Sequence, residues 1–250
     1  MIRRDDRGVS DLVGFVLIFS VIIGSAAVIF TVGLGTLDDY KAGVQTQNAE
    51  GTMRSVDDAL VAIESGRSPH RTVQMRLHDG RLRLSNESDT AINVTVSTPD
   101  GTSTTGFSPG TLAYRLDGST VAYQGGAVFR ADGESAVAVD GPGFRCDEGS
   151  VAIVSVVSLR ASGSTQRSGS VTTVEFERDR TTLHVPTGGS PVVDAGEEAT
   201  VEVTVRSDYD AAWERPMTEA GWSTPSPNTY TCDATRVVVR ETVVDVGLGS

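Results

Sequence analysis

The distribution of hydrophobic and polar residues divides the chain near position 38. Residues Leu12 to Leu37 include no charged side chain, whereas acidic and polar residues are interspersed throughout the sequence after Asp38. An α-helix over the apolar stretch would reach roughly 39 Å, which exceeds the roughly 30 Å of hydrocarbon in a bilayer and allows some tilt. The pattern therefore predicts a transmembrane helix over residues 9–37, with residues 38–250 outside the bilayer.

The helical period continues beyond the predicted span. Apolar residues recur at helical spacing: Ala49, Met53, Val56, Leu60 and Ile63. We expect Asp57, Asp58 and Glu64 to lie off this stripe, and Gly66 followed by Pro69 to end the helix. Residues 38–66 are therefore predicted to form an amphipathic helical stalk, whose apolar stripe packs against a partner surface.

From Arg71 onward the period changes to two, in short β-branched runs separated by Gly, Ser, Asp and Pro. TVQMRL and RLRLS flank His78-Asp79-Gly80, which predicts a hairpin around an Asp-Gly turn. The run VAIVSVVSLR is the most apolar and is expected in the middle of a sheet, and residues 208–219 predict a short helix or an irregular excursion. The pattern indicates an all-β, antiparallel, sandwich-like domain over residues 69–250, without a parallel sheet built from crossover helices.

The charges that flank the apolar stretch predict its orientation. Arg3, Arg4 and Arg7 precede it, whereas Lys41 is the one basic residue close behind it, next to acidic neighbours. An excess of Lys and Arg marks the cytoplasmic side of a membrane helix. We therefore expect a cytoplasmic N-terminus and an extracellular C-terminal domain at the cell surface.

Three interpretations of the N-terminal segment remain open. In the first, it is a secretory signal peptide cut after Ser25-Ala26-Ala27, although the apolar run continues beyond that site. In the second, it is an uncleaved signal anchor. In the third, the small residue at the cleavage site precedes the apolar segment, so the helix would stay on the mature protein.

The third interpretation rests on the order basic cluster, Arg7-Gly8, Val9-Ser10-Asp11-Leu12-Val13-Gly14 and apolar helix. This order resembles the class III signal peptide of archaeal type IV pilins and archaellins, and the head is similar to those of haloarchaeal pilin-like proteins. The resemblance implies that a prepilin peptidase cuts between Gly8 and Val9, removing residues 1–8. It also implies that the helix joins other pilin-like subunits through the pilus assembly machinery. Many such heads have Pro where this chain has Asp11, which favours a minor or atypical subunit.

The charge of the chain is strongly acidic, with a formal value of −12. Loss of the predicted leader, which holds three arginines and two aspartates, would take this charge to −13. Such a surface repels nucleic acid. The basic residues are arginines apart from Lys41, and this acidic, lysine-poor composition resembles that of halophilic archaeal proteins.

Cys146 and Cys232 are the two cysteines of the chain. In a domain that faces an oxidising exterior, a disulfide is a better interpretation of such a pair than a redox or metal site. On the chain-entropy model, closing so long a loop stabilises the fold by roughly 4–5 kcal/mol.

Candidate chemistry is sparse. The three histidines His70, His78 and His184 lie far apart and lack metal-ligand spacing, so we expect no catalytic residue, cofactor or metal. A calcium interpretation of Asp208, Asp210 and Glu214 lacks the glycine and the later glutamate of an EF-hand loop. The two tryptophans, Trp213 and Trp222, are expected in the core in preference to a sugar-stacking platform.

Two N-x-S/T sequons, at Asn86 and Asn93, are candidate glycosylation sites because the predicted topology places both outside. The resemblance to glycosylated pilins and archaellins supports this interpretation.

The leading functional hypothesis is a pilin-like subunit anchored in the membrane, with an acidic β-domain used for adhesion or assembly. The alternative is an uncleaved single-pass envelope protein with a ligand-binding or S-layer-contacting domain. A third hypothesis, an anchored extracellular hydrolase, requires histidines and acidic groups clustered in a cleft.

Overall fold

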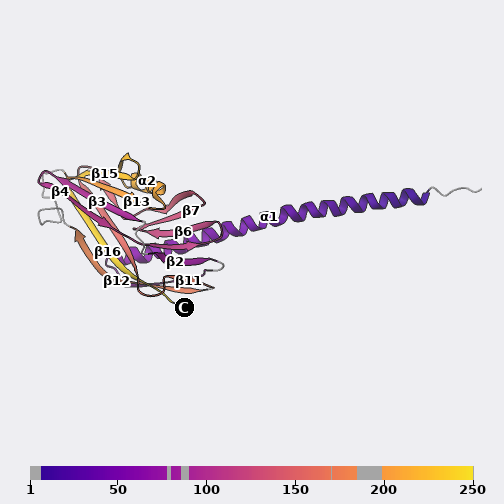
Figure 1. Ribbon diagram of the computed structural model, residues 1–250, viewed down its shortest axis with the longest axis horizontal. Helices are drawn as coiled ribbons and strands as arrows, with labels where there is room; N and C mark the ends of the chain where they lie inside the picture. The colour runs from indigo at the N-terminus through magenta and orange to yellow at the C-terminus, as the bar shows by residue number, and fades with distance from the viewer. Residues whose placement is uncertain (1–6, 78–79, 86–89, 170, 185–198, 250) are drawn as a thin grey trace, which may run out of the picture. The chain divides into compact units, whose positions relative to one another are not determined.

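The computed structural model describes residues 7–77, 80–85, 90–169, 171–184 and 199–249, without the side chains of residues 7–11 and 30–39. It begins with a helix of 58 residues, α1 (Arg7–Glu64), followed by strands and one further helix, α2 (Asp210–Glu219). The chain forms two compact units, residues 1–45 and 46–250. The last turns of α1 thus belong to the same unit as the strands, and this unit is drawn at the left of Figure 1.

The strands of the second unit form three sheets within the described residues. In spatial order, sheet A contains β1 (His70–Met75), β12 (Thr172–His184), β16 (Arg236–Leu248), β10 (Val151–Ala161) and β9 (Arg145–Asp147). Sheet B contains β11 (Gln166–Ser168), β2 (Arg81–Ser85), β5 (Thr111–Arg115), β6 (Ser119–Gln124), β7 (Ala127–Asp132) and β8 (Ser135–Asp140). Sheet C contains β14 (Ser223–Ser226), β15 (Thr229–Ala234), β13 (Ala199–Arg206), β3 (Ala91–Thr98) and β4 (Gly101–Phe107). The unit is therefore mostly β, as the alternating sequence pattern predicts.

Sheet A contains the one parallel ladder among the described strands. β10 runs parallel to β16 from the pair Val151–Arg236 to the pair Ala161–Val246, and the other ladders are antiparallel. As the apolar run predicts, β10 lies inside the sheet, between β16 and β9. Its Val154 and Val156 join one core cluster and its Val157 and Leu159 the other. A strand buried on both faces needs a continuous apolar run.

The apolar stripe of α1 is one wall of the second core cluster. Ala49, Met53, Val56, Leu60 and Ile63 are each at most 1 % exposed and pack with side chains from sheets A and B. Burying a large apolar side chain stabilises a fold by roughly 1.5–3 kcal/mol, so the helix and the sheets depend on each other. As predicted, the helix ends before Gly66, which has a φ of +75° and donates its N–H to the Ile63 carbonyl oxygen.

The first core cluster combines side chains of all three sheets with those of α2. Trp213 is fully buried and contacts the rings of Phe129 and Phe144, and Trp222 is 2 % exposed. Both tryptophans therefore belong to the core, as predicted, and the helix that carries Trp213 is one of the two outcomes expected for residues 208–219.

The hairpin predicted around Asp79-Gly80 is wrong. β1 pairs with β12 in sheet A, whereas β2 pairs with β5 and β11 in sheet B. His78 and Asp79 lie outside the described residues. The Gly80 N–H binds the Leu77 carbonyl oxygen, and a Cβ at Gly80 would collide with the Tyr114 ring and approach the Arg115 carbonyl oxygen to 2.9 Å. The chain therefore passes from sheet A, where β1 ends at Met75, to sheet B, where β2 begins at Arg81.

Candidate functional site

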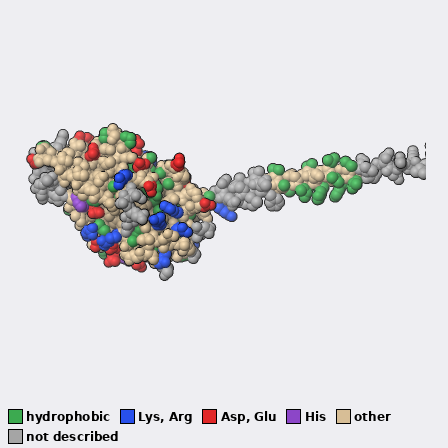
Figure 2. All heavy atoms as spheres, in the orientation of Figure 1, with side chains coloured by type: hydrophobic (Ala, Val, Ile, Leu, Met, Phe, Trp, Pro, Cys, Tyr) green, Lys and Arg blue, Asp and Glu red, His purple; other side chains and the backbone are tan. Residues whose placement is uncertain are grey.

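The most exposed apolar surface lies on α1. Among the described residues, the segment Leu12–Ile29 is the one helix long and apolar enough to cross a membrane, with a mean hydropathy of 2.7. None of it is buried, and Phe15 and Ile29 are 65 % and 71 % exposed. Figure 2 shows the segment as a run of hydrophobic side chains between two undescribed stretches. Exposure of this kind is unfavourable in water, so the segment is suited to a membrane.

Gly8 and Val9, the predicted cleavage pair, lie in the first turns of α1. The side chain of Val9 and residues 1–6 of the leader lie outside the described part of the structure. Cleavage between Gly8 and Val9 therefore stays a prediction.

The opposite end of α1 holds a buried carboxyl group that sequence patterning misplaced. Asp57 was expected off the apolar stripe, but it is 8 % exposed, and its Oδ1 has no hydrogen-bond partner among the described residues. Burial, together with the charges of Asp140, Asp58 and Glu64, raises the pKa of Asp57 from 3.8 to about 7. Burial and the nearby Asp57 and Glu64 likewise raise the pKa of the Tyr123 phenol. The helix therefore meets the sheets through a group that is half ionised near neutral pH.

Cys146 on β9 and Cys232 on β15 form the expected disulfide, with an S–S distance of 1.99 Å and a Cα–Cα distance of 5.9 Å. The bridge joins sheet A to sheet C and closes a loop with a sequence separation of 86. Gly221, with a φ of +91°, turns the chain against the Cys146 carbonyl oxygen, where a Cβ would collide with that oxygen. The disulfide thus fixes a crowded junction at the end of α2.

The two sequons differ in what the structure describes. Asn86 lies outside the described residues. Asn93 lies on β3 and is exposed, opposite Gly106 of β4. The hydroxyl of Thr95, the third residue of this sequon, lies 3.0 Å from the Thr104 hydroxyl. The outer face of sheet C therefore presents Asn93 to solvent beside a position without a side chain.

A groove of about 590 Å³ separates α2 from the β14–β15 hairpin. Two carboxylates line it, those of Asp210 and Glu214, and the Asp210 Oδ2 accepts a hydrogen bond of 3.0 Å from the Asn228 side chain. Tyr230 also lines the groove; it is fully buried, and its hydroxyl has no partner in the described part of the chain. Burial and the charges of Glu214 and Asp210 raise the pKa of Tyr230 to about 12. The groove is thus suited to a cationic group.

The three acidic residues of the calcium interpretation do not share this groove. Asp210 and Glu214 line it, but Asp208 lines a separate hollow beside Arg83 and Arg115. The structure therefore does not assemble them into a calcium site.

That second hollow belongs to a basic surface that sequence analysis did not identify, here named the arginine face: Arg81, Arg83 and Arg115 on sheet B. Arg81 and Arg115 are direct partners across β2 and β5. Two hollows, of about 360 and 120 Å³, meet at Arg83 and Arg115. In the sequence, the alternating arginines of RLRLS indicate that Arg81 and Arg83 lie on one face of a strand. The sequence does not indicate that Arg115 joins them, because this depends on the pairing of β2 with β5.

Histidines and potential metal ligands are dispersed. His70 is exposed on β1, His184 packs edge-on against Phe107, and His78 lies outside the described residues. Among the residues described, one group of three offers ligand atoms within 4.8 Å of one another, Cys146, Glu148 and Cys232. Its two sulfur atoms are bonded to each other, so the group does not fit a metal.

Comparison with known proteins adds a family without an assigned activity. No curated protein and no solved structure matches the chain. The model of a family described as a family of unknown function, DUF7289, matches residues 7–247. The match begins at the first residue of α1 and ends at Gly247, one residue before the end of β16. Because it spans nearly the whole sequence, the chain belongs to the family of unknown function DUF7289.

Proposed function

We propose that this chain is a pilin-like, membrane-anchored cell-surface protein, a minor or atypical subunit of a type IV pilus-like structure. Prepilin peptidase would cut it after Gly8 at the cytoplasmic face, and α1 would then join other subunits. The β-rich unit would form an extracellular, sandwich-like domain with an acidic surface suited to high salt. The order of residues from Arg7 to Gly14 supports this function.

The observation that carries the proposal is that α1 combines two different segments in one helix. One uninterrupted helix holds an exposed apolar segment, Leu12–Ile29, and a stripe whose residues are buried in the β-rich unit. A simple anchor needs only the first of these, since a flexible linker can join it to its domain. A helix that is both a membrane segment and a structural part of the domain is the arrangement that an assembling pilin-like subunit requires.

Two further features support an extracellular position. The disulfide between Cys146 and Cys232 fits an oxidising compartment. The basic residues before Leu12 fit a cytoplasmic N-terminus.

The test is the N-terminus of the mature protein. The full chain is produced in a host with and without the prepilin peptidase, purified from membranes, and mapped by peptide mass spectrometry. We expect Val9 as the first residue only when the peptidase is present. Gly8→Phe should block processing, and Ser10→Ala, one residue beyond Val9, is the matched control that should be cut normally. Retention of Met1 or Ile2 with the peptidase present would contradict the proposal and favour an uncleaved single-pass envelope protein.

A further inference from the structure

Two arginines of the arginine face lie together without acidic partners. Arg81 and Arg115 are opposite each other on β2 and β5, both are exposed, and neither forms a hydrogen bond or an ion pair in the described part of the chain. Like charges directly opposite each other on a sheet are destabilising. Among the described residues the pair therefore lacks a stabilising partner, which an acidic group on another molecule would supply.

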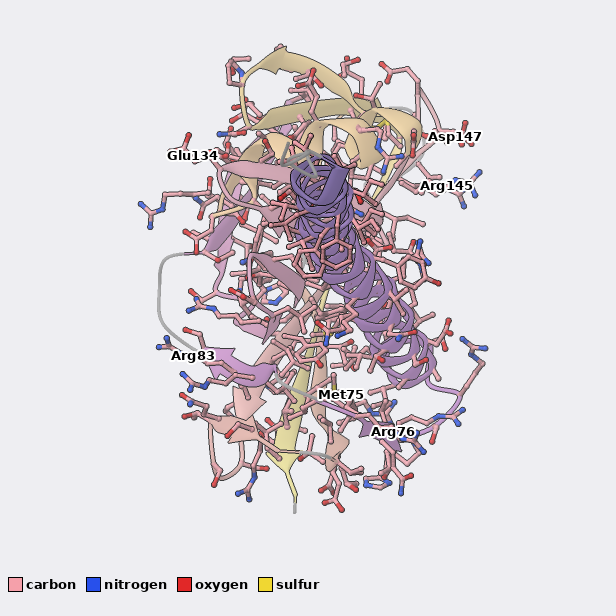
Figure 3. All side chains as sticks on the ribbon, turned by 90° about the vertical axis from the view of Figure 1, so that its right-hand side faces the viewer. Met75, Arg76, Arg83, Glu134, Arg145 and Asp147 are labelled. Atoms are coloured by element: carbon pink, nitrogen blue, oxygen red, sulfur yellow. A yellow bond between two sulfur atoms is a disulfide. The ribbon has the colours of Figure 1, made fainter. Side chains whose placement is uncertain are left out.

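The surroundings of these arginines remain basic. Asp117 lines the larger hollow and Asp208 the smaller one, while Arg83 and Arg115 line both. A local excess of positive charge is unusual on a chain with a formal charge of −12. Figure 3 places the labelled Arg83 on the opposite side of the view from the labelled pair Arg145 and Asp147.

The groove beside α2 has the complementary character. Asp210 and Glu214 line it, and no Lys or Arg is among its lining residues. The Tyr230 hydroxyl is an independent sign of a missing partner, because this side chain is fully buried, lines the groove and has an unsatisfied hydroxyl in the described structure. A buried hydroxyl without a partner is costly, so the wall of the groove beside the two carboxylates is not fully satisfied within the described structure.

We propose that these two surfaces are the two halves of one contact between copies of this chain. The guanidinium groups of Arg81 and Arg115 on one copy bind Asp210 and Glu214 in the groove of the next copy. The planar guanidinium group binds carboxylates in bidentate geometry, and Pro225 and Pro227 give the groove an apolar wall for the guanidinium plane.

A second copy explains more than a small ligand does. A free anion would neutralise the arginine face and leave the groove unexplained, and a free cation would do the reverse. A copy of the same chain supplies both partners. Because the contact joins two different surfaces, it adds subunits in one direction unless a ring closes. The inference rests on the proposed function in this respect, since it names the partner of a pilin-like subunit and the residues that bind it.

The test is a charge swap in the full-length chain, purified in detergent micelles and measured by analytical ultracentrifugation. Arg81→Glu with Arg115→Glu should weaken self-association by at least about tenfold, and so should Asp210→Arg with Glu214→Arg. The chain with all four substitutions should return to within about threefold of the unmodified affinity, because each contact is restored with reversed signs. Arg83 stays unchanged throughout, and raising the salt concentration should weaken every contact of this kind.

The matched control reverses Arg145 and Asp147, two exposed residues of β9, as Arg145→Asp with Asp147→Arg. It should leave self-association unchanged. Circular dichroism melting shows whether each variant is folded, and a 1:1 mixture of the two paired variants, which also re-creates complementary surfaces, should associate as the four-substitution chain does.

Failure of both the four-substitution chain and the mixture to associate, with melting curves like that of the unmodified chain, overturns the inference. So does an unmodified chain that stays monomeric in low salt. The result is separable from that of the cleavage experiment. If the mature chain begins at Val9 but the charge swap does not restore association, only the proposed contact is contradicted. If the charge swap restores association in a chain that keeps Met1, only the pilin-like function is contradicted.

Discussion

The carboxylate of Glu64, the last residue of α1, accepts a hydrogen bond of 2.8 Å from the guanidinium group of Arg240 on β16. The same guanidinium donates through its Nε to the Ser155 hydroxyl on β10, at 2.9 Å. The two charged side chains are 11 % and 31 % exposed, so water screens the pair only in part. This contact ties the end of the helix to the two strands of the parallel ladder.

Replacement of Glu64 by Gln is expected to lower the free energy of unfolding by about 2 kcal/mol, because Arg240 would lose a charge-assisted partner in a partly buried position. Denaturant unfolding of the full chain in micelles measures this change. Glu219→Gln is the matched control, since Glu219 pairs with Arg215 on the surface at 64 % and 61 % exposure. The control should change stability by less than about 0.5 kcal/mol, and equal effects of the two substitutions would contradict the assigned role of Glu64.

Asp57 should make the fold less stable as pH rises. The carboxyl group is neutral in the folded protein up to about pH 7, whereas in the unfolded chain it ionises near 3.8. The folded state therefore binds the extra proton between these values, and the contribution of Asp57 to stability falls as pH increases through this window. Asp57→Asn should raise the free energy of unfolding at pH 8 by about 1–3 kcal/mol, with a smaller gain at pH 5.

The control for Asp57 is its exposed neighbour. Asp58→Asn also removes one negative charge from the same turn of α1, but the side chain of Asp58 faces solvent. Thermal melts between pH 5 and pH 8 should show a large pH-dependent difference from the unmodified chain for Asp57→Asn. The difference should be much smaller for Asp58→Asn, which removes only one of the charges that raise the pKa of Asp57. Parallel curves for both variants would show that the burial of Asp57 does not control this dependence.

The sequence predicted the apolar stripe of α1 correctly but misjudged one position on it. Asp57 follows Met53 by four residues and precedes Leu60 by three, so helical spacing alone places it among the buried residues. Residue type led to the opposite expectation, because carboxylates are seldom buried without a partner. The buried Asp57 is thus a case in which spacing was the better guide than polarity.

Strand positions could be predicted far better than strand pairing. The β-branched run AINVTVST coincides with β3. Within TLAYRLDGSTVAYQGGAVFR, the structure forms the meander β5–β6–β7. The turn after Leu77 carried an equally good hairpin signal, yet β1 pairs with β12, about a hundred residues later in the sequence. A turn motif in the sequence therefore does not show by itself that the two strands beside it pair with each other.

The candidate contact surfaces depend on these distant pairings. Arg81 and Arg115 meet only because β2 pairs with β5, and Tyr230 reaches Asp210 and Glu214 only because β15 lies beside α2. The disulfide could be predicted without knowing the strand pairing, since two cysteines allow one intramolecular bridge.

Loss of the disulfide should destabilise the second unit strongly. Replacement of both Cys146 and Cys232 by Ser is expected to lower the free energy of unfolding by about 4 kcal/mol, because the unfolded chain would no longer be constrained over a long loop. A reducing agent should lower the denaturation midpoint of the unmodified chain to about that of the double variant. The midpoint of the double variant itself should not change on reduction. An unmodified chain with the same midpoint in oxidising and reducing conditions would contradict a stabilising role for the bridge.

Asn93 is expected to carry a glycan when the protein is made in its own membrane system. Its side chain projects from the outer face of sheet C opposite Gly106, so an attached sugar meets no side chain on that partner position. Glycopeptide mass spectrometry should find a mass increase on the peptide that contains Asn93, and Asn93→Gln should abolish it.

Thr95 separates recognition of the sequon from a change in the strand. Thr95→Ala removes the hydroxyl that the sequon needs and also its contact with Thr104, whereas Thr95→Ser keeps a hydroxyl at the same position. The mass increase should vanish in Thr95→Ala and persist in Thr95→Ser. A chain that has been exported but whose Asn93 peptide carries no added mass would contradict this prediction. Exposure of Asn93 on β3 would then not be sufficient for glycosylation.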